Sequence, residues 1–262
     1  KNNTWVSGKS YLSQKIGFTD VDSNFQKIYN FGFEAQRFLD NNKERKSILE
    51  TIKPYTHVNY QRLRFLWNVA ERVSVSEPPG AFVETGVWRG GCAGILSYIS
   101  KKYHYKNGLY FFDSFEGLPQ PTFEDGKDAE TFAVGKTEGE LKSINKVQAE
   151  ENYIKELLFD RLVIDPSKVN IVKGWFQDTL PLYKNRIGDI AILRLDGDWY
   201  ESTKVALENL YGLVRPGGYI IIDDYYFWDG CKKAVDEFIK DNELRVEIKR
   251  QDASGAYFIK AK

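Results

Sequence analysis

The 262-residue sequence lacks the features that define several large classes of protein. No apolar run approaches the ~20 residues that a membrane-spanning helix needs, so no membrane association is expected. Basic and acidic residues balance at 37 each, and no sustained basic face indicates nucleic-acid binding. The partner we expect is therefore a small molecule.

Cysteine, histidine and methionine are also scarce. Cys92 and Cys231 are too few for a disulfide framework and lie in predicted helices, so reduced thiols and a cytoplasmic location are expected. The only two histidines, His57 and His104, form no Ser/His/Asp or Cys/His arrangement typical of nucleophilic catalysis. The chain has no methionine and begins at Lys1, so we expect it to be a trimmed chain.

The most informative stretch is a strand, a glycine turn and a helix. Residues 81–83 predict a buried strand that ends at Glu84, residues 86–91 form the turn, and residues 92–99 predict a helix. The spacing is G-x-x-x-G-G, not the G-x-G-x-x-G of dinucleotide binders, and a carboxylate at Glu84 would repel a pyrophosphate. Both features favour S-adenosylmethionine (SAM) over NAD. The alternative is a tight turn without a ligand.

Strands and helices alternate after this unit. Further strands are predicted at 109–113, 169–173, 190–196 and 219–223, helices at 141–158, 201–214 and 230–240, a turn at 215–218, and a terminal hairpin from 245–249 and 256–260. This order predicts an α/β fold with a Rossmann-like, doubly wound, mostly parallel sheet and a C-terminal antiparallel hairpin. It is the layout of class I SAM-dependent methyltransferases.

The N-terminal part differs from this pattern. Residues 1–53 are polar with scattered aromatics, and helices are expected at 33–39 and 46–52 without intervening strands. We predict a helical cap or lid over residues 1–53 and a methyltransferase domain over residues 54–262. The long loop at 116–140 is predicted to be a lid or disordered.

Several predicted strands end in an acidic residue: Glu84, Asp113, Asp196 and the pair Asp223-Asp224. Parallel strands place their carboxyl ends along one edge of the sheet, where ligands bind. Asp113 lies about one β-α unit after the glycine turn, where a carboxylate that accepts hydrogen bonds from ribose hydroxyls is expected. The alternative for Asp113 is an Asx turn with Ser114.

Asp196, Asp223 and Asp224 would converge if the strands that they end are neighbours. Such a concentration of negative charge is costly when unpaired, and a divalent cation resolves it. The ligands would be oxygens without Cys or His nearby, which favours Mg²⁺ over Zn²⁺; solvated carboxylates are the alternative. Gly197 lets the chain turn, so that Asp198 becomes the candidate general base; otherwise it caps the helix that follows.

Aromatic and cationic residues near these acids are weaker candidates. Trp88 and Arg89 follow the first strand, and Trp175 and Phe176 follow the third, where an adenine would lie in this layout. The aromatic run at 225–228 is a candidate wall of an acceptor site. Each of these residues has core packing or surface exposure as its alternative role.

Five motifs together resemble the macrocin O-methyltransferase family, which includes sugar O-methyltransferases of macrolide and aminocoumarin biosynthesis. The motifs are ETGVWRGG at 84–91, FDSFEGLP at 112–119, KGWFQDTLP at 173–181, LRLDGDWYEST at 193–203 and RPGGYIIIDDY at 215–225. The resemblance runs from about Pro54 to Lys260. It implies SAM- and Mg²⁺-dependent methylation of a hydroxyl on a sugar or glycoside.

The resemblance also implies roles for residues at matching positions. Asp196, Asp223 and Asp224 would hold the metal, and Asp198, beside Asp196 in the catalytic centre, would be the general base. The residues implied to bind SAM are Tyr55, Thr56, Glu84, Thr85, Gly86, Val87, Trp88, Arg89, Asp113, Ser114, Gly174, Trp175, Phe176 and Asp196.

Other functions remain open at this point. The same fold could methylate a catechol or another vicinal diol, or the protein could be a catalytically idle module that binds SAM or metal. A nicotinamide dehydrogenase is disfavoured by the glycine spacing and by Glu84. The aromatic residues of the N-terminal part suggest a homo-oligomer.

Overall fold

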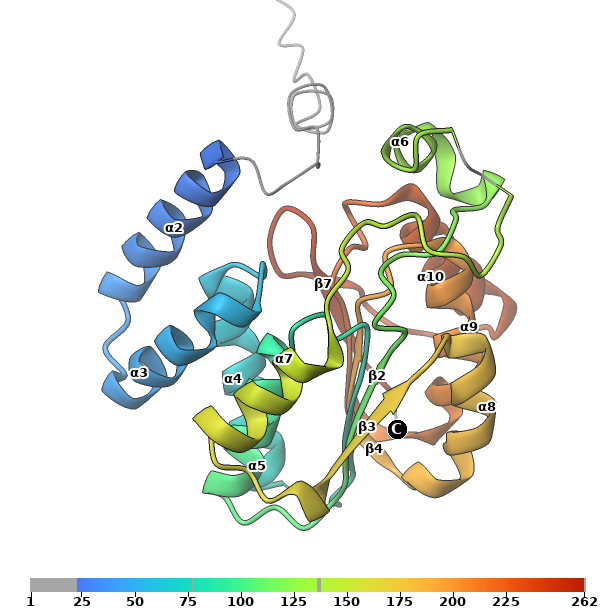
Figure 1. Cartoon of the computed structure of the whole chain (residues 1–262). Coiled ribbons are helices and arrows are strands. Elements are labelled where there is room, and N and C mark those ends of the chain that lie inside the picture. The colour runs from blue at the N-terminus through green and yellow to red at the C-terminus, as the bar shows by residue number, and fades with distance from the viewer. Residues whose placement is uncertain (1–22, 77, 136–137, 262) are drawn as a thin grey trace, which may run out of the picture.

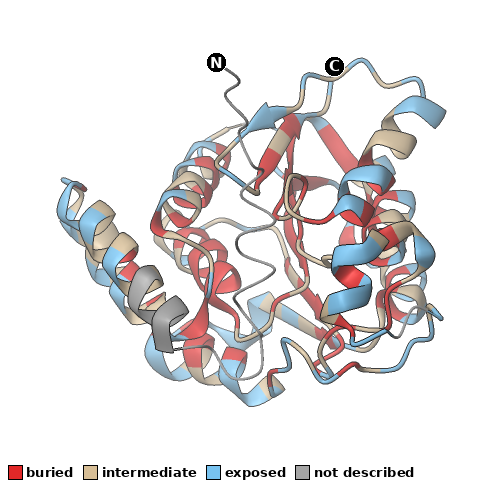
Figure 2. Ribbon diagram, turned by 90° about the horizontal axis from the view of Figure 1, so that it is seen from above, coloured by how far each residue is buried: buried red, intermediate tan, exposed pale blue. Residues whose placement is uncertain are grey.

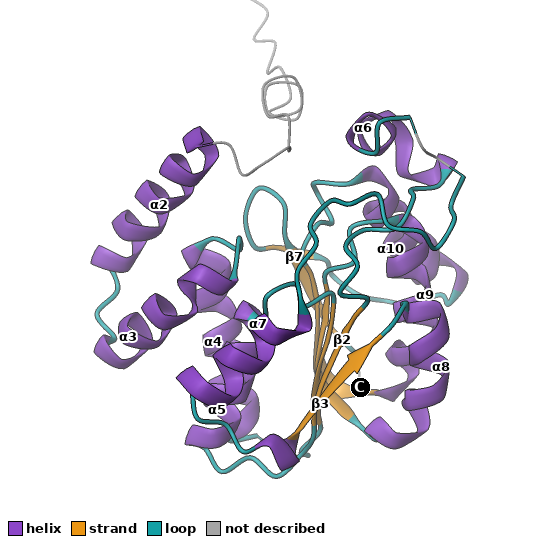
Figure 3. Ribbon diagram, viewed as in Figure 1, coloured by secondary structure: helices purple, strands orange, loops and turns teal. Residues whose placement is uncertain are grey.

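The computed structural model describes residues 23–76, 78–135 and 138–261, and these form a sheet of seven strands with helices on both faces (Figures 1 and 3). The strand order is β3-β2-β1-β4-β5-β7-β6. The bounds are β1 Ala81–Thr85, β2 Leu109–Asp113, β3 Val169–Lys173, β4 Ile190–Leu195, β5 Val214–Ile222, β6 Lys249–Arg250 and β7 Ala256–Ile259. Strands β1 to β5 pair in parallel, and β7 pairs antiparallel with both β5 and β6. The predicted doubly wound α/β sheet with an antiparallel C-terminal hairpin is confirmed.

Two groups of helices cover the two faces of the sheet (Figure 1). One group contains α2 Ser23–Phe38, α3 Lys43–Ile52, α4 Tyr60–Ser74, α5 Gly91–Lys102 and α7 Glu151–Lys155; the other contains α8 Phe176–Ile187, α9 Tyr200–Leu210 and α10 Asp229–Asp241. The short helix α6 Gly126–Phe132 lies beyond the carboxyl ends of the strands. Among the described helices, none combines the length and apolar character needed to cross a bilayer.

Each face of the sheet has its own hydrophobic core, because successive strand residues point to opposite faces. In β1, Phe82 packs in the core beneath α4 and α5, whereas Val83 packs in the core beneath α8 and α9. In β2, Phe111 likewise packs in the first of these cores and Phe112 in the second. Figure 2 shows the buried residues concentrated along the strands and on the inner sides of the helices. The apolar runs that predicted these strands therefore reflect burial on both faces.

The helices before the sheet join the first of these cores. Phe33 of α2 and Leu49 and Ile52 of α3 are buried in the same cluster as α4 and α5, whereas Phe31 and Phe38 of α2 are exposed. The predicted boundary at residue 53 stays a prediction. Residues 1–22 of the predicted cap lie outside the described residues.

The predicted helix at 141–158 is wrong over its first ten residues. The α-helix begins at Glu151, and it continues into a π-helical turn at Glu156–Arg161. The segment before it pairs instead with the loop that follows β2: the Leu118 amide donates to the Lys146 carbonyl at 3.0 Å, and the Ile144 amide donates to the Leu118 carbonyl at 2.9 Å. These long-range bonds use the backbone groups that a helix would have needed.

Three smaller differences concern turns and loops. Residues 215–218 lie inside β5 rather than in a separate turn, because the pairing with β4 shifts between Ile190 and Ile192 and leaves room for extra residues. The first strand of the hairpin has only two residues, Lys249–Arg250. The described part of the loop at 116–140 is folded, with a 3₁₀ turn at Phe123–Asp125 that leads into α6.

Asp40, in the short link between α2 and α3, fixes these two helices onto α4. Its buried carboxylate accepts hydrogen bonds from Nε and Nη2 of Arg45, both at 2.6 Å, from the Tyr60 hydroxyl at 2.8 Å, and from the Asn42 amide at 2.9 Å. Burial alone would raise the pKa of Asp40, but the hydrogen bonds from Arg45 and the Asn42 amide outweigh it and leave the pKa below its ordinary value.

We expect Asp40→Asn to lower the free energy of unfolding at pH 7 by about 2 kcal/mol, because charge-assisted hydrogen bonds to Arg45 are lost. The contribution of the carboxylate is full above its unfolded-state pKa of about 3.9 and shrinks as the pH falls towards the lower folded-state pKa. Urea unfolding of both proteins at pH 7 and pH 3 measures this. An equal difference at both pH values would contradict the charged role of Asp40.

Candidate active site

The carboxyl ends of β1, β4 and β5 are held side by side by hydrogen bonds that continue past the paired strands. The Asp196 amide donates to the Thr85 carbonyl at 2.8 Å, and the Asp223 amide donates to the Leu195 carbonyl at 2.9 Å. These bonds bring the acidic ends of the three strands to one edge of the sheet. The predicted convergence of these acids is therefore present in the structure.

Three carboxylates form a compact cluster at this edge. Asp196, Asp198 and Asp224 each offer an oxygen, and these oxygens lie within 4.8 Å of one another. Burial raises the pKa of Asp198 to about 7, with the nearby charge of Asp196 contributing to the rise, while burial and the charge of Asp198 hold the pKa of Asp224 well above its ordinary value. A set of hard oxygens that repel one another fits a divalent cation such as Mg²⁺.

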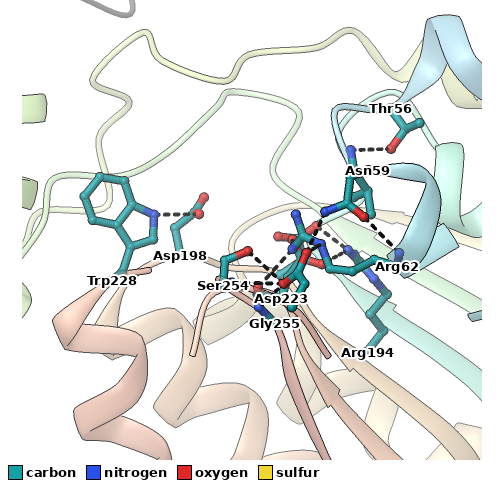
Figure 4. A network of polar contacts seen from close by, with 12 residues as sticks. Thr56, Asn59, Arg62, Arg194, Asp198, Asp223, Trp228, Ser254 and Gly255 are labelled. Atoms are coloured by element: carbon teal, nitrogen blue, oxygen red, sulfur yellow. Dashed lines mark hydrogen bonds and ion pairs between the residues drawn. The ribbon is translucent and has the colours of Figure 1, made fainter. Parts of the chain in front are cut away.

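Asp198 reaches the cluster through an unusual backbone turn. Its φ angle is +62°, in the left-handed region that non-glycine residues rarely occupy. The Trp228 indole Nε1 donates to Asp198 Oδ1 at 3.0 Å and fixes the side chain (Figure 4). Trp228 belongs to the aromatic run predicted as an acceptor wall, and its contact with Asp198 was not anticipated.

Asp223, the third predicted metal ligand, makes different contacts. Its Oδ1 pairs with Nη2 of Arg194, and its Oδ2 accepts from Nη1 of Arg62 at 2.7 Å (Figure 4). Arg194 Nη1 also donates to Glu84 Oε1 and to Asp196 Oδ2, each at 2.7 Å. The metal set predicted from sequence stays a prediction, because both carboxylate oxygens of Asp223 contact arginines here.

Sequence reasoning missed both arginines. A signal for Arg194 was present, since it is the single charged residue within the apolar strand IAILRL, and a charge buried in a sheet needs a partner. Arg62 lies on α4 and is 161 residues from Asp223 in the chain, so no local pattern pointed to their contact.

Glu84 has one oxygen paired and one free. Its side chain is 1% exposed, Oε1 binds Arg194, and Oε2 is buried without a hydrogen-bond partner. Burial raises the pKa of Glu84 to about 8. An unpartnered carboxylate oxygen at the wall of a cavity fits a ligand that brings a donor or a positive charge.

A first cavity encloses about 620 Å³, including space open to solvent, beside the glycine turn. Predicted SAM-binding residues that line it are Gly86, Trp88, Asp113, Ser114, Trp175, Phe176 and Asp196. Leu118, Pro119 and Val147 add an apolar wall from the segments that pair beyond β2. The lid candidate at 116–140 and the segment before α7 thus both contribute to this cavity.

A second cavity of about 1,070 Å³, also counted with its open part, lies beside the first. Predicted site residues that line it are Tyr55, Thr56, Glu84, Val87, Trp88, Asp196, Asp198, Asp223 and Asp224. Phe132, Phe227 and Trp228 form aromatic walls there. Trp88, Asp196 and Asp198 line both cavities, so the acidic cluster lies where the two spaces meet.

Asp113 holds the glycine turn as well as lining the first cavity. Its Oδ2 accepts from the amides of Val87 and Trp88 at 2.7 and 2.8 Å, and its Oδ1 accepts from the Phe115 amide at 2.7 Å. The last bond is the Asx turn considered as the alternative role. The structure thus contains the turn and also places this carboxylate at the cavity where the ribose was expected.

Three predicted SAM-binding residues line neither cavity. Thr85 is buried in β1, Gly174 turns the chain at φ +140° after β3, and the Arg89 guanidinium stacks on Trp88 at 4.5 Å and on Tyr153 at 4.7 Å. The centroid of the Trp88 ring also lies 4.2 Å from that of the His57 ring. Arg89 therefore supports Trp88, and His57 is a further residue of the second cavity that sequence reasoning left without a role.

Comparisons with known proteins agree on one family. The model of the macrocin O-methyltransferase (TylF) family matches residues 19–260. The chain is 34% identical over 205 residues to the demethyldecarbamoylnovobiocin O-methyltransferase of Streptomyces niveus, and the match covers 78% of this chain and 75% of that protein. It is 36% identical over 205 residues, with the same coverage, to an 8-demethyl-8-(2,3-dimethoxy-alpha-L-rhamnosyl)-tetracenomycin-C 4'-O-methyltransferase of Streptomyces olivaceus.

A solved structure supports the same relationship. The structure of the O-methyltransferase NovP is 32% identical, with a TM-score of 0.67, and the similarity covers 79% of this chain and 83% of that one. The predicted class I methyltransferase fold is thereby confirmed.

Among the glycines of the turn, Gly86 has the least space for a side chain. Its φ angle is +86°, and a Cβ there would lie 1.8 Å from the Asp196 carbonyl oxygen. Gly188, between α8 and β4, has a similar φ of +71°, but a Cβ there would meet nothing within 4 Å. The two glycines thus share the backbone constraint and differ in crowding.

We expect Gly188→Ala to cost about 1–3 kcal/mol of stability, from its backbone conformation alone, since φ +71° with ψ −155° is a region that residues other than glycine rarely adopt. Gly86→Ala should cost about 1–3 kcal/mol more, from overpacking, and should displace Asp196 and weaken binding of S-adenosylhomocysteine. Thermal unfolding and calorimetric titration of both variants test this. Equal stability and equal affinity in the two variants would contradict the role of close packing at Gly86.

Proposed function

Because the chain belongs to the macrocin O-methyltransferase family and is an O-methyltransferase, we propose that it methylates a sugar hydroxyl, using SAM as donor and Mg²⁺ as a required ion. The acceptor is a small sugar or glycoside. The observation that carries this proposal is that Asp196 and Asp198 line both cavities. A donor in one cavity and an acceptor in the other would meet at these carboxylates.

The first cavity fits the adenosine part of SAM. Asp113 offers carboxylate oxygens to ribose hydroxyls, and Trp175 and Phe176 offer aromatic surface to the adenine. Glu84 Oε2, buried and without a partner, suits the positively charged methionine end, and Thr56 and Val87 line the same space. With this division, the sulfonium would lie near Trp88, which lines both cavities.

The residues that would hold Mg²⁺ include Asp196 and Asp224, which the sequence prediction and the oxygen cluster share. The ion supplies Lewis acidity that lowers the pKa of an acceptor hydroxyl. Asp198 is the proposed proton acceptor, because Trp228 aims its side chain and it lies beside Asp196 and Asp224 without being needed to hold the ion. Asp223 supports the cluster through its arginine contacts.

Relatives point to a sugar as the acceptor. The name of the tetracenomycin enzyme describes a substrate that carries a rhamnosyl group. A third relative, 32% identical over 206 residues, is the mycinamicin III 3''-O-methyltransferase of Micromonospora griseorubida. The aromatic side chains of Phe132, Phe227 and Trp228 offer flat apolar walls against which the apolar face of a sugar ring can pack.

The first experiment is a calorimetric titration with S-adenosylhomocysteine, with and without Mg²⁺, against NAD as control. Micromolar binding of S-adenosylhomocysteine and none of NAD is expected. Transfer of labelled methyl from SAM is then measured on a panel of glycosides and catechols. Methyl transfer to catechols alone would show that the acceptor is a catechol-like vicinal diol and not a sugar. Binding of S-adenosylhomocysteine without any methyl transfer would favour a catalytically idle module.

We expect Asp196→Asn to abolish Mg²⁺-dependent turnover while the affinity for S-adenosylhomocysteine stays within a few fold. The substitution keeps the shape of the side chain but removes the charge of a proposed ligand. Turnover and titration of the same preparation measure the two effects. Retained activity would overturn the metal assignment.

We expect Asp198→Asn to lower turnover by about 10²-fold or more, because the amide cannot accept the proton. As a base rather than a ligand, Asp198 should leave Mn²⁺ affinity within a few fold, measured by electron paramagnetic resonance. A large loss of Mn²⁺ binding would make Asp198 a ligand instead. An unchanged turnover rate would exclude it from both roles.

The proposal includes three organisational predictions. We propose a cytoplasmic location, as expected from the two cysteines, both of which are free and buried. We also propose a homo-oligomer, as the exposed Phe31 and Phe38 of α2 suggest. The predicted cap, residues 1–53, would act as a lid on the domain at residues 54–262.

A further inference from the structure

The loop between β6 and β7 is fastened to the start of α4 by Asp252. One oxygen, Oδ2, accepts from Nδ2 of Asn59 at 2.6 Å and forms an ion pair with Nε of Arg62 at 3.2 Å. The other oxygen, Oδ1, accepts from the amides of Ser254 and Gly255 at 2.9 and 2.8 Å. Asp252 therefore gives the Arg62 guanidinium a charged partner through an ion pair that is not a hydrogen bond, and it shapes its own loop.

Arg62 contacts both Asp252 and the acidic residue that follows β5, Asp223. Its Nη1 donates to Asp223 Oδ2 at 2.7 Å and also to the Asp223 main-chain carbonyl at 3.0 Å. The second contact matters because that carbonyl belongs to the peptide that joins Asp223 to Asp224. On the far side of Asp224, its carbonyl accepts from the amides of Phe227 and Trp228 at 2.9 and 3.0 Å. The peptides on both sides of Asp224 are thus fixed.

This fixation is needed because pairing with β7 has stopped, although the Asp223 amide still donates to the Leu195 carbonyl of β4 at 2.9 Å. The register between β5 and β7 ends at Ile222 opposite Ala256, so β7 does not hold Asp223 or Asp224. Successive side chains of an extended strand point to opposite faces, and a bend must be held in place if both acids are to face the same edge. Arg62 supplies that hold with a planar guanidinium that contacts several oxygens at once.

Burial makes the contact strong. The Arg62 side chain is 13% exposed, and those of Asp223 and Asp252 are 9% and 12% exposed. Hydrogen bonds between charged groups are short and strong in such surroundings, and removing one partner leaves a buried charge without compensation. Arg62 also lines the second cavity, so it is next to the acidic cluster and not remote from it.

We propose that Arg62, oriented by Asp252 and Asn59, is a positioning residue that fixes the Asp223-Asp224 peptide so that Asp224 lies beside Asp196 as a ligand of the proposed ion, with the base Asp198 next to both. The inference rests on the proposed function in that the cluster binds a divalent cation. According to this inference, α4 and the β6–β7 loop position residues of the active site, although both lie outside the five sequence motifs.

The test measures Mn²⁺ affinity of the full chain by electron paramagnetic resonance, with S-adenosylhomocysteine present, together with turnover. Arg62→Lys keeps the charge, but a single ammonium cannot contact Asp252, Asp223 Oδ2 and the Asp223 main-chain carbonyl at the same time. We expect Mn²⁺ binding to weaken about 10–100-fold, the usual effect of losing a residue that orients a metal ligand. The kcat should fall while the acceptor KM and the affinity for S-adenosylhomocysteine change little.

Gln61→Ala is the matched control. Gln61 is exposed on the same turn of α4, and its Nε2 donates to the Gln251 carbonyl of the same loop at 3.0 Å, but it does not contact Asp223. Its loss should leave Mn²⁺ affinity unchanged. Asp252→Asn, which removes the charge that orients Arg62, should weaken Mn²⁺ binding less than Arg62→Lys does.

Chemical rescue separates positioning from general stability. Added ethylguanidinium should restore part of the Mn²⁺ binding of Arg62→Ala and should leave the wild type unaffected. If Arg62→Lys and Asp252→Asn bind Mn²⁺ as the wild type does, the inference is overturned while the proposed function stands. If the wild type itself binds no Mn²⁺, the metal assignment fails and the inference fails with it.

Discussion

One buried guanidinium, that of Arg194, holds the acidic ends of three strands together. Arg194 lies in β4, its side chain is 3% exposed, and it contacts Glu84 in β1, Asp196 after β4 and Asp223 after β5. A buried carboxylate without a partner costs several kcal/mol, so three of them could not share this edge alone. The planar fork of an arginine can bind all three at once, which the single ammonium of a lysine cannot do. The placement of Asp196 in the site therefore depends on a buried arginine of β4 that also lines the second cavity.

Even with this arginine, negative charge is in excess around the second cavity. Five carboxylates line it, against the guanidinium groups of Arg62 and Arg194. Burial is the largest cause of the raised pKa values of Glu84, Asp198 and Asp224, and the charges of neighbouring carboxylates raise them further. A sulfonium donor and a divalent ion would offset the excess of negative charge, so both cofactors are favoured by the same electrostatic feature.

The sequence predicted those parts of the fold that depend on local signals. The strands at 109–113 and 169–173 were predicted to the residue, because polar or glycine-containing segments bound two short apolar runs. The helix at 141–158 failed at its start, where pairing of Ile144 with Leu118 overrides the local pattern. The acids of the site were visible because each ends a strand. Their arginine partners were not, because a contact such as that between Arg62 and Asp223 is formed only by the tertiary fold.

The glycine turn shows how packing and ligand binding are combined in one motif. The spacing of its glycines was interpreted as favouring SAM, yet a Cβ at Gly91 would lie 2.4 Å from that of Thr56. Gly91 thus lets the segment before α4 approach the turn, and Thr56 lines the second cavity as a result. Trp88, held at φ +50° by the Asp113 carboxylate, separates that cavity from the first. Because backbone strain of this kind persists only where surrounding contacts enforce it, the turn, Asp113 and the Thr56 segment form one unit. The family match, over residues 19–260, covers the segment that carries Thr56 as well as the turn.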